Sequence, residues 1–169
     1  MPNDRGYQKG KLRCLKNLYD WENLSSMVGQ LWDAELSDLE KRGLFNQYNS
    51  ENLLEIAQEG LESSWNLGEW DDFSKYIKVL RRSNSPNSFN KSFYQAILDI
   101  KRGKYLDANK HIERARQILD PQITSLLGES YSRAYSLIQD LQSLKELEEV
   151  IQYVRTNDEQ RKKHFYSLW

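Results

Sequence analysis

The sequence predicts an all-α protein built from paired helices that repeat along the chain. Apolar residues recur with a helical period through nearly the whole sequence, and no stretch shows the sustained alternation of a half-buried strand. Only 3 prolines and 8 glycines interrupt the 169 residues, and 12 % of the residues are aromatic. This aromatic content is typical of a folded chain rather than a disordered one.

Four helices are expected in the first half of the chain. Their ranges are 10–19, 21–32, 51–67 and 69–81. The third has the clearest boundaries, because Ser50 can cap its first turn and Gly68 can end it. In the first, the regular spacing of Leu12, Leu15 and Leu18 predicts a single buried face.

The second half is expected to begin with a loop at 83–90, where Pro86 lies among serines and asparagines. Five further helices are expected, over 91–102, 105–119, 121–140, 143–154 and 157–168. The boundary before the third of these rests on Asp120 and Pro121, a pair that is typical of the N-cap and first position of a helix.

Corners between helices share a pattern along the chain. Each of three second helices opens with an aromatic residue: Trp21, Trp70 and Tyr105. Glycines precede the last two of these by two positions: Gly68 and Gly103. A fourth corner is expected at DLQSLKEL, with Leu144 in the aromatic position, and the acidic stretch 33–50 is interpreted as an insertion. The pattern predicts degenerate tetratricopeptide-like repeats, stacked as an α-solenoid in which neighbouring units bury each other's apolar faces.

The expected domain organisation is a flexible basic tail at residues 1–9 followed by a helical-repeat segment at 10–169. The final residues FYSLW keep an apolar helical pattern, so we expect the repeat array to be incomplete at its C-terminal end. The sequence shows neither the core of a signal peptide nor a run of about 18 apolar residues, which favours a soluble, cytoplasmic protein.

Charges are distributed in blocks, although the net charge is only -1. Residues 1–20 carry five basic and two acidic side chains, and residues 21–72 carry twelve acidic and two basic ones. Residues 73–119 carry eleven basic and three acidic ones. Complementary faces of neighbouring helices explain this pattern most simply. The alternative is a basic face that binds an anionic partner. A nucleic acid is the less favoured partner, because the interleaved Tyr94 and Tyr105 fall on the expected core stripes.

The sequence contains no recognisable catalytic constellation. It lacks a Gly-rich phosphate loop and the signature motifs of a kinase catalytic domain. His111 and His164 have no Cys or His at ligand spacing, so no metal site is expected and His111 is interpreted as a surface or boundary residue. Cys14 is interpreted as a buried structural thiol. The run GESYS at 128–132 falls within a helical pattern and lacks the second glycine of a nucleophile elbow. We therefore expect neither enzymatic activity nor a cofactor in this chain.

Four blocks of sequence carry a more specific signal. They are LRCLKNLYDWENL (12–24), SSWNLGEWDDFSKYI (63–77), SFYQAILDIKRGKYLDANKHIERARQILD (92–120), and GESYSRAY (128–135) with ELEEVIQY (146–153). In this order they resemble the FAT region of TOR-type, PI3K-related Ser/Thr protein kinases. The chain departs from the family pattern where Ser63 and Ser64 replace two alanines and where Gln95 replaces an arginine.

This resemblance implies a non-catalytic α-solenoid that clamps or supports a kinase domain within a large complex. The implied partners are the kinase domain and further FAT repeats in cis, and complex subunits in trans. The family also offers surfaces to inhibitory proteins and a pocket for an inositol polyphosphate. The candidate anion-binding residues in this chain are Arg155, Arg161, Lys162 and Lys163. The alternative function is a free-standing adaptor that binds a peptide or protein through its concave face.

Overall fold

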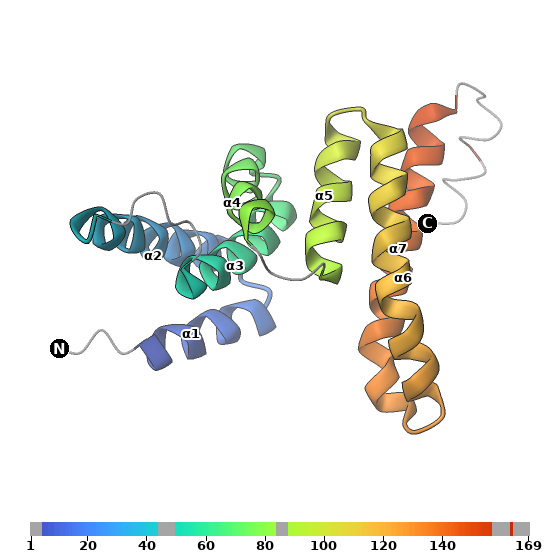
Figure 1. Cartoon of the computed structure of the whole chain (residues 1–169), viewed down its shortest axis with the longest axis horizontal. Coiled ribbons are helices and arrows are strands. Elements are labelled where there is room, and N and C mark those ends of the chain that lie inside the picture. The colour runs from blue at the N-terminus through green and yellow to red at the C-terminus, as the bar shows by residue number, and fades with distance from the viewer. Residues whose placement is uncertain (1–4, 44–49, 84–87, 157–162, 164–169) are drawn as a thin grey trace. The chain divides into compact units, whose positions relative to one another are not determined.

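The computed structural model describes residues 5–43, 50–83, 88–156 and 163 (Figure 1). All regular structure in these ranges is α-helical, as the sequence predicts. The helices are α1 (Arg5–Asn17), α2 (Trp21–Lys41), α3 (Glu51–Leu67), α4 (Trp70–Arg82), α5 (Phe89–Lys101), α6 (Tyr105–Leu127) and α7 (Tyr131–Arg155). They form two compact units, unit 1 (residues 1–85) and unit 2 (residues 86–169). Within each unit every helix packs against the next, and α5 also contacts α7.

Three helical hairpins, α1–α2, α3–α4 and α5–α6, turn through the same corner. The residue two positions before each second helix has a positive φ: Tyr19 (56°), Gly68 (73°) and Gly103 (73°). The residue that follows has nearly the same φ and ψ each time: Asp20 (-85°, 74°), Glu69 (-82°, 76°) and Lys104 (-88°, 62°). The sequence repeat is therefore also a repeat of backbone conformation.

Each corner also repeats the two hydrogen bonds of a Schellman motif, in which the left-handed residue and its successor donate to carbonyls of the last turn. The bonds that reach back five residues join Asp20 N to Leu15 O (3.0 Å), Glu69 N to Ser64 O (2.9 Å) and Lys104 N to Asp99 O (2.8 Å). The bonds that reach back three residues join Tyr19 N to Lys16 O (3.0 Å), Gly68 N to Trp65 O (3.4 Å) and Gly103 N to Ile100 O (3.0 Å). These bonds satisfy carbonyls that a helix end would otherwise leave open.

The core of unit 1 depends on a close crossing of α3 and α4. A Cβ atom on Gly60 would lie 2.6–2.9 Å from three ring atoms of Tyr76. The same ring meets the edge of Trp32 from α2, with centroids 4.9 Å apart at 77°. Ser63 and Ser64, which replace the two alanines of the family pattern, are buried and donate to the Gly60 carbonyl, so their hydroxyl groups are satisfied within the helix.

The core of unit 2 is mainly aliphatic. The alanines that the sequence predicts at close helix crossings are all fully buried: Ala96, Ala108, Ala115 and Ala134. Larger side chains that are at most 2 % exposed fill the space around them: Ile97, Ile112, Leu119, Leu144 and Ile151. Small residues let the helix axes approach, and the branched side chains then pack into the gaps.

The predicted helix boundary at Asp120 and Pro121 is wrong, because α6 continues through both residues to Leu127. Pro121 cannot donate a hydrogen bond to the carbonyl four residues earlier, which is costly inside a helix. The buried positions Leu119 and Ile123 nevertheless keep one stripe facing the core across the proline. Burial of this continuous stripe offsets the lost hydrogen bond, so packing overrides the local signal.

The fourth predicted corner is also wrong, because α7 runs unbroken from Tyr131 to Arg155. Leu144 lies in its middle and is fully buried. The neighbouring polar residues Gln142 and Ser143 lie on the open side of the helix, and Ser143 Oγ donates to the Gln139 carbonyl (3.1 Å). The run DLQSLKEL thus combines polar residues with the buried Leu144 and Leu147 within one long helix.

The predictions for the N-terminal region need three corrections. Helix α1 begins at Arg5, so residues 5–9 of the predicted tail are helical, whereas residues 1–4 lie outside the described part. Of the predicted buried face, Leu12 is buried, but Leu18 is 74 % exposed because it lies past the helix end in the corner. Cys14 is exposed, because α1 presents only a narrow stripe to its neighbours.

Two predictions concern segments at the edges of the described ranges. Helix α2 extends to Lys41, so part of the stretch interpreted as an insertion is helical and contributes the buried Leu39. The predicted helix at 157–168 lies outside the described residues, except for Lys163.

Candidate binding surfaces

The aromatic residues of the three predicted corners are the first residues of α2, α4 and α6. Trp21 meets the edge of Tyr19, with centroids 5.8 Å apart. Trp70 lies between Trp65 (6.1 Å) and Phe73 (5.7 Å), so it links the end of α3 to the first turn of α4. Tyr105, at the start of α6, is half-buried.

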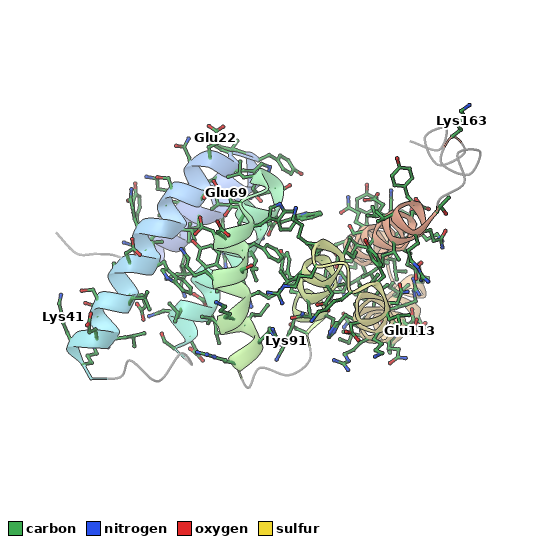
Figure 2. All side chains as sticks on the ribbon, turned by 90° about the horizontal axis from the view of Figure 1, so that it is seen from above. Glu22, Lys41, Glu69, Lys91, Glu113 and Lys163 are labelled. Atoms are coloured by element: carbon green, nitrogen blue, oxygen red, sulfur yellow. The ribbon has the colours of Figure 1, made fainter. Side chains whose placement is uncertain are left out.

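The corners of the first two hairpins are connected. Ser25 Oγ, in the first turn of α2, donates to Glu69 Oε2, which precedes α4 (2.9 Å). Figure 2 shows Glu22 and Glu69 at the same end of unit 1, while Lys41 marks the other end of α2. The repeated corners of unit 1 therefore lie at one end of its helices.

A groove of about 730 Å³ runs between α1, α2 and α3 in unit 1. Apolar side chains from all three helices line it: Leu12, Leu31, Ala34 and Ile56. Carboxylates from α2 and α3 line it as well: Glu35, Asp38, Glu55 and Glu59. The basic side chains along it come from α1: Lys9 and Arg13. The groove thus combines apolar surface with an excess of negative charge.

Ion pairs hold α1 to α3 beside this groove. Lys9 Nζ lies 2.6 Å from Glu55 Oε2, and Lys16 Nζ lies 2.5 Å from Glu62 Oε2 and 3.5 Å from Glu59 Oε2. Burial by itself would lower the pKa of Lys16, but the hydrogen bond and charge of Glu62, together with Glu59, outweigh it and raise that pKa above its ordinary value. Basic α1 and acidic α3 therefore supply complementary faces, as the charge blocks predict.

A second polar group lies on α4. Lys75 Nζ sits 4.8 Å from the centroid of the Tyr76 ring and 5.7 Å from that of Trp32, and it also pairs with Asp72 (2.9 Å). Burial would lower the pKa of Lys75, but Asp72 and Tyr76 outweigh it and raise the pKa. Burial likewise raises the pKa of the Tyr76 hydroxyl. The contacts of Tyr76 and Lys75 with Trp32 join α4 to α2.

Unit 2 contains a buried polar cluster between α5 and α6. Gln95 Nε2 donates to Asp99 Oδ1 (3.1 Å), and His111 Nε2 lies 3.5 Å from Asp99 Oδ2. Gln95 and Asp99 are 9 % and 5 % exposed. His111 is half-buried, which agrees with the boundary alternative of its interpretation as a surface or boundary residue. The cluster places a glutamine beside Asp99 where the family pattern has an arginine.

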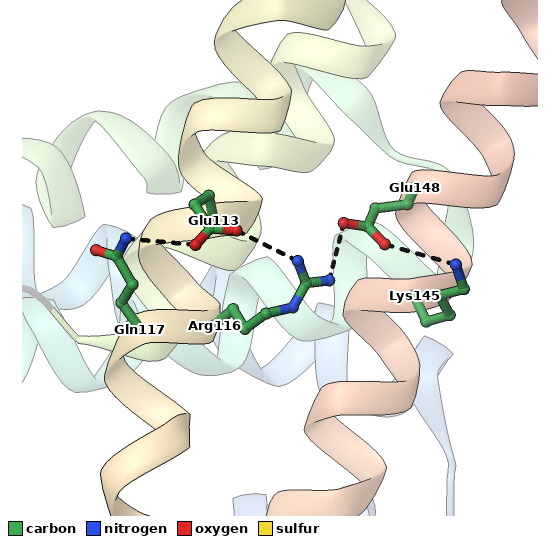
Figure 3. Close-up of polar contacts among 5 residues, drawn as sticks. All are labelled: Glu113, Arg116, Gln117, Lys145 and Glu148. Carbon is green, nitrogen blue, oxygen red and sulfur yellow. Dashed lines mark hydrogen bonds and ion pairs between the residues drawn. The ribbon is translucent and has the colours of Figure 1, made fainter.

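An ion-pair network joins α6 to α7 (Figure 3). Arg116 donates to Glu148 Oε1 on α7 (2.8 Å) and to Glu113 Oε2 on its own helix (3.3 Å). Lys145 Nζ lies 3.8 Å from Glu148 Oε2. The hydrogen bond with Glu148 raises the pKa of Arg116. The network ties the two long helices of unit 2 together.

The predicted anion-binding residues are only partly described. Arg155 is exposed in the last turn of α7, and Lys163 is exposed. Arg161 and Lys162 lie outside the described residues. Anion binding by these four residues stays a prediction.

The motif GESYS, which was compared with a nucleophile elbow, lies between two helices. GESYS, expected inside a helix, instead spans the α6–α7 connection, with Gly128 ending α6 and Ser130 preceding α7. In the described ranges no three His, Cys, Asp or Glu side chains gather as a metal ion would require. Over the same residues, no helix is both long enough and apolar enough to cross a bilayer.

Sequence reasoning missed the groove entirely. Its residues come from three helices and share no local motif, so only the packing of α1 against α2 and α3 brings them together. The excess of acidic residues in 21–72 was the one available signal, and it indicated a charge but not a cavity.

Comparison with known proteins gives one consistent result. The FAT domain family matches residues 57–169. The chain is 34 % identical over 179 residues to the serine/threonine-protein kinase TOR of Arabidopsis thaliana, covering 95 % of this chain and 7 % of that protein. It is 37 % identical over 144 residues to the serine/threonine-protein kinase tor1 of Schizosaccharomyces pombe, covering 85 % and 5 %. Identity to the TOR kinase of Oryza sativa is 32 % over 157 residues, covering 85 % and 6 %. The chain thus spans a small fraction of these relatives.

Proposed function

Because the chain belongs to the FAT domain family, we propose that it is a non-catalytic helical-repeat scaffold of a TOR-type Ser/Thr protein kinase. In this role it supports or clamps the kinase domain and helps to assemble a complex in growth and nutrient signalling. Its cis partners are the kinase domain and further repeats, its trans partners are complex subunits, and its location is the cytoplasm. The match over residues 57–169 carries the proposal.

Exposed apolar side chains in unit 2 support a role in protein contacts. Leu127 ends α6 at 54 % exposure, and Tyr131 and Tyr135 follow on α7 at 70 % and 53 %. Tyr131 and Tyr135 are four residues apart and therefore lie on one side of the helix. Exposed aromatic residues grouped in this way are typical of protein interfaces.

The test isolates the polypeptide that carries this chain from its natural source and measures its kinase activity and its bound subunits. We expect Ser/Thr kinase activity to accompany the chain. In that polypeptide, Tyr131→Glu with Tyr135→Glu should release a bound subunit or lower activity, because two charges would be placed in an apolar contact. Gln139→Glu with Gln152→Glu adds the same charge at exposed positions of α7 and serves as the control.

One result would contradict the scaffold proposal, and another would contradict only the contact surface. A short polypeptide without kinase activity would instead support the free-standing adaptor. Full assembly and activity in the Tyr131 and Tyr135 variant would remove the proposed contact surface.

A further inference from the structure

We propose that the groove between α1, α2 and α3 is a docking site for a basic segment of another protein. The segment would place an apolar side chain on the groove floor and a lysine or arginine near Glu35 and Asp38. This inference concerns unit 1 alone and does not depend on the kinase scaffold proposal.

The shape of the groove fits a protein segment. Its volume, about 730 Å³, is large enough for several side chains, and its walls come from three helices rather than one. Leu31 and Ala34 on α2 face the groove together with Ile56 on α3. A leucine or similar side chain of the partner would find apolar contacts there.

The charges of the groove define the partner's chemistry. Glu55 is already paired with Lys9, and Glu59 lies 3.5 Å from Lys16. Among the described residues, Glu35 accepts a hydrogen bond from Ser50 (3.0 Å) but forms no ion pair, and Asp38 forms none either. Both lie on α2 three residues apart, so their carboxylates share one side of the helix. They are the acidic groups left to attract an incoming cation.

The test measures binding to the full 169-residue chain by fluorescence anisotropy. The probe is a short labelled peptide in which lysine pairs alternate with leucine pairs. Two reference peptides replace either every lysine with glutamate or every leucine with serine. We expect saturable binding of the first peptide alone, and weaker binding as salt is raised, because exposed charges are screened.

Variants locate the site. Glu35→Gln with Asp38→Asn should weaken binding about fivefold to tenfold, because two favourable charge contacts are lost. Glu22→Gln with Glu40→Gln makes the same charge change at exposed positions of α2 outside the groove and should weaken binding by less than about twofold. Ala34→Trp should abolish binding by filling the floor. Circular dichroism checks that each variant remains folded.

Hydrogen exchange provides an independent readout on the unmodified chain. Bound peptide should protect amides of α1, α2 and α3 and leave unit 2 unchanged. Equal losses in the groove pair and the control pair would overturn the proposal, as would unchanged binding by Ala34→Trp or protection located in unit 2. Absence of saturable binding by the lysine–leucine peptide would also overturn it.

Discussion

Units 1 and 2 use the same corner but different means of packing. In unit 1 a glycine on α3 lets an aromatic ring from α4 approach the helix backbone, and tryptophan and lysine side chains surround that ring. In unit 2 buried alanines and aliphatic residues bring two long helices together, and Arg116 and Glu148 join them at the side. The same hairpin backbone therefore accommodates different side-chain packing in the two units.

This difference also determines where each unit is vulnerable. Unit 1 depends on one close contact, between Gly60 and Tyr76, that allows no added atom. Unit 2 depends on the continuity of α6 and α7, which carry their buried stripes over 23 and 25 residues. Substitutions chosen for one unit should therefore have little effect in the other.

The largest effect is expected from a break in α7. Ser143→Pro removes a backbone donor in the middle of the helix and should destabilise unit 2 by about 3 kcal/mol or more. The measurement is urea unfolding followed by circular dichroism. Ser143→Ala, which removes only the side-chain bond to the Gln139 carbonyl, is the control and should change stability by less than about 0.5 kcal/mol. Unchanged stability of Ser143→Pro would contradict a continuous α7 and favour the corner predicted from the sequence.

A smaller but clear effect is expected from Gly60→Ala. The new Cβ would collide with the Tyr76 ring, so we expect a loss of about 1–3 kcal/mol from unit 1. Gly29→Ala on α2 is the matched control, because its Cβ meets no atom within 4 Å. That variant should gain up to about 1 kcal/mol from better helix propensity. Tryptophan fluorescence suits the measurement, because four of the 5 tryptophans lie in unit 1. A neutral Gly60→Ala would contradict the close crossing.

The corners should respond by about 1 kcal/mol. Gly68→Ala and Gly103→Ala place a Cβ on a left-handed residue and should each destabilise the protein by about this amount. Tyr19→Gly relieves the same strain at the first corner, but it also removes the ring contact with Trp21, so a gain of about 0.5 kcal/mol is expected. Thermal unfolding of the three variants is the measurement. A gain in stability from Gly68→Ala would contradict the shared corner.

The smallest effect is expected from alkaline pH, and it should be confined to unit 1. The folded pKa values of Tyr76, Lys75 and Lys16 all lie above their ordinary values of 10.0, 10.5 and 10.5. A raised folded pKa means that the folded chain holds protons that the unfolded chain releases, so stability is lost as the pH rises above about 10. Tyr76→Phe should reduce this loss, whereas Tyr131→Phe, at an exposed position of unit 2, should not change it. The measurement is the urea midpoint at pH 9 and at pH 11 for the unmodified protein and both variants. An equal fall in the midpoint for all three proteins would contradict the assignment of this loss to Tyr76.

Unit 2 has a related dependence in the acidic range. Burial raises the pKa of Asp140 above its ordinary value of 3.8. Stability should therefore fall as the pH rises through the region near 4, the same direction as in unit 1 but in a separate window.

Local signals predicted three of the four expected corners correctly and the two long helices poorly. Ser50 and Gly68 bound α3 as predicted, because capping and left-handed geometry act over a single turn. Tyr19 was not recognised as a left-handed residue, since no glycine marks it and only the surrounding corner imposes its conformation. At Pro121 the local signal misled, because burial of Leu119 and Ile123 decides the course of α6.

The candidate sites were harder to predict from the sequence than the corners were. The charge blocks predicted complementary faces, and the pairs of α1 with α3 confirm this for Lys9 and Lys16. The groove required the relative placement of three helices, which no single segment encodes. The substitution of an arginine by Gln95 was visible in the sequence, but its partners Asp99 and His111 became clear only in the folded unit.

The central structural claim is that three hairpins share one backbone corner whatever residue occupies it. NMR measurement of backbone chemical shifts and HN–Hα couplings at residues 19, 68 and 103 tests it most directly. We expect positive φ at all three positions, with Tyr19 matching the two glycines. A negative φ at Tyr19 would show that the first hairpin turns differently and would contradict the shared corner.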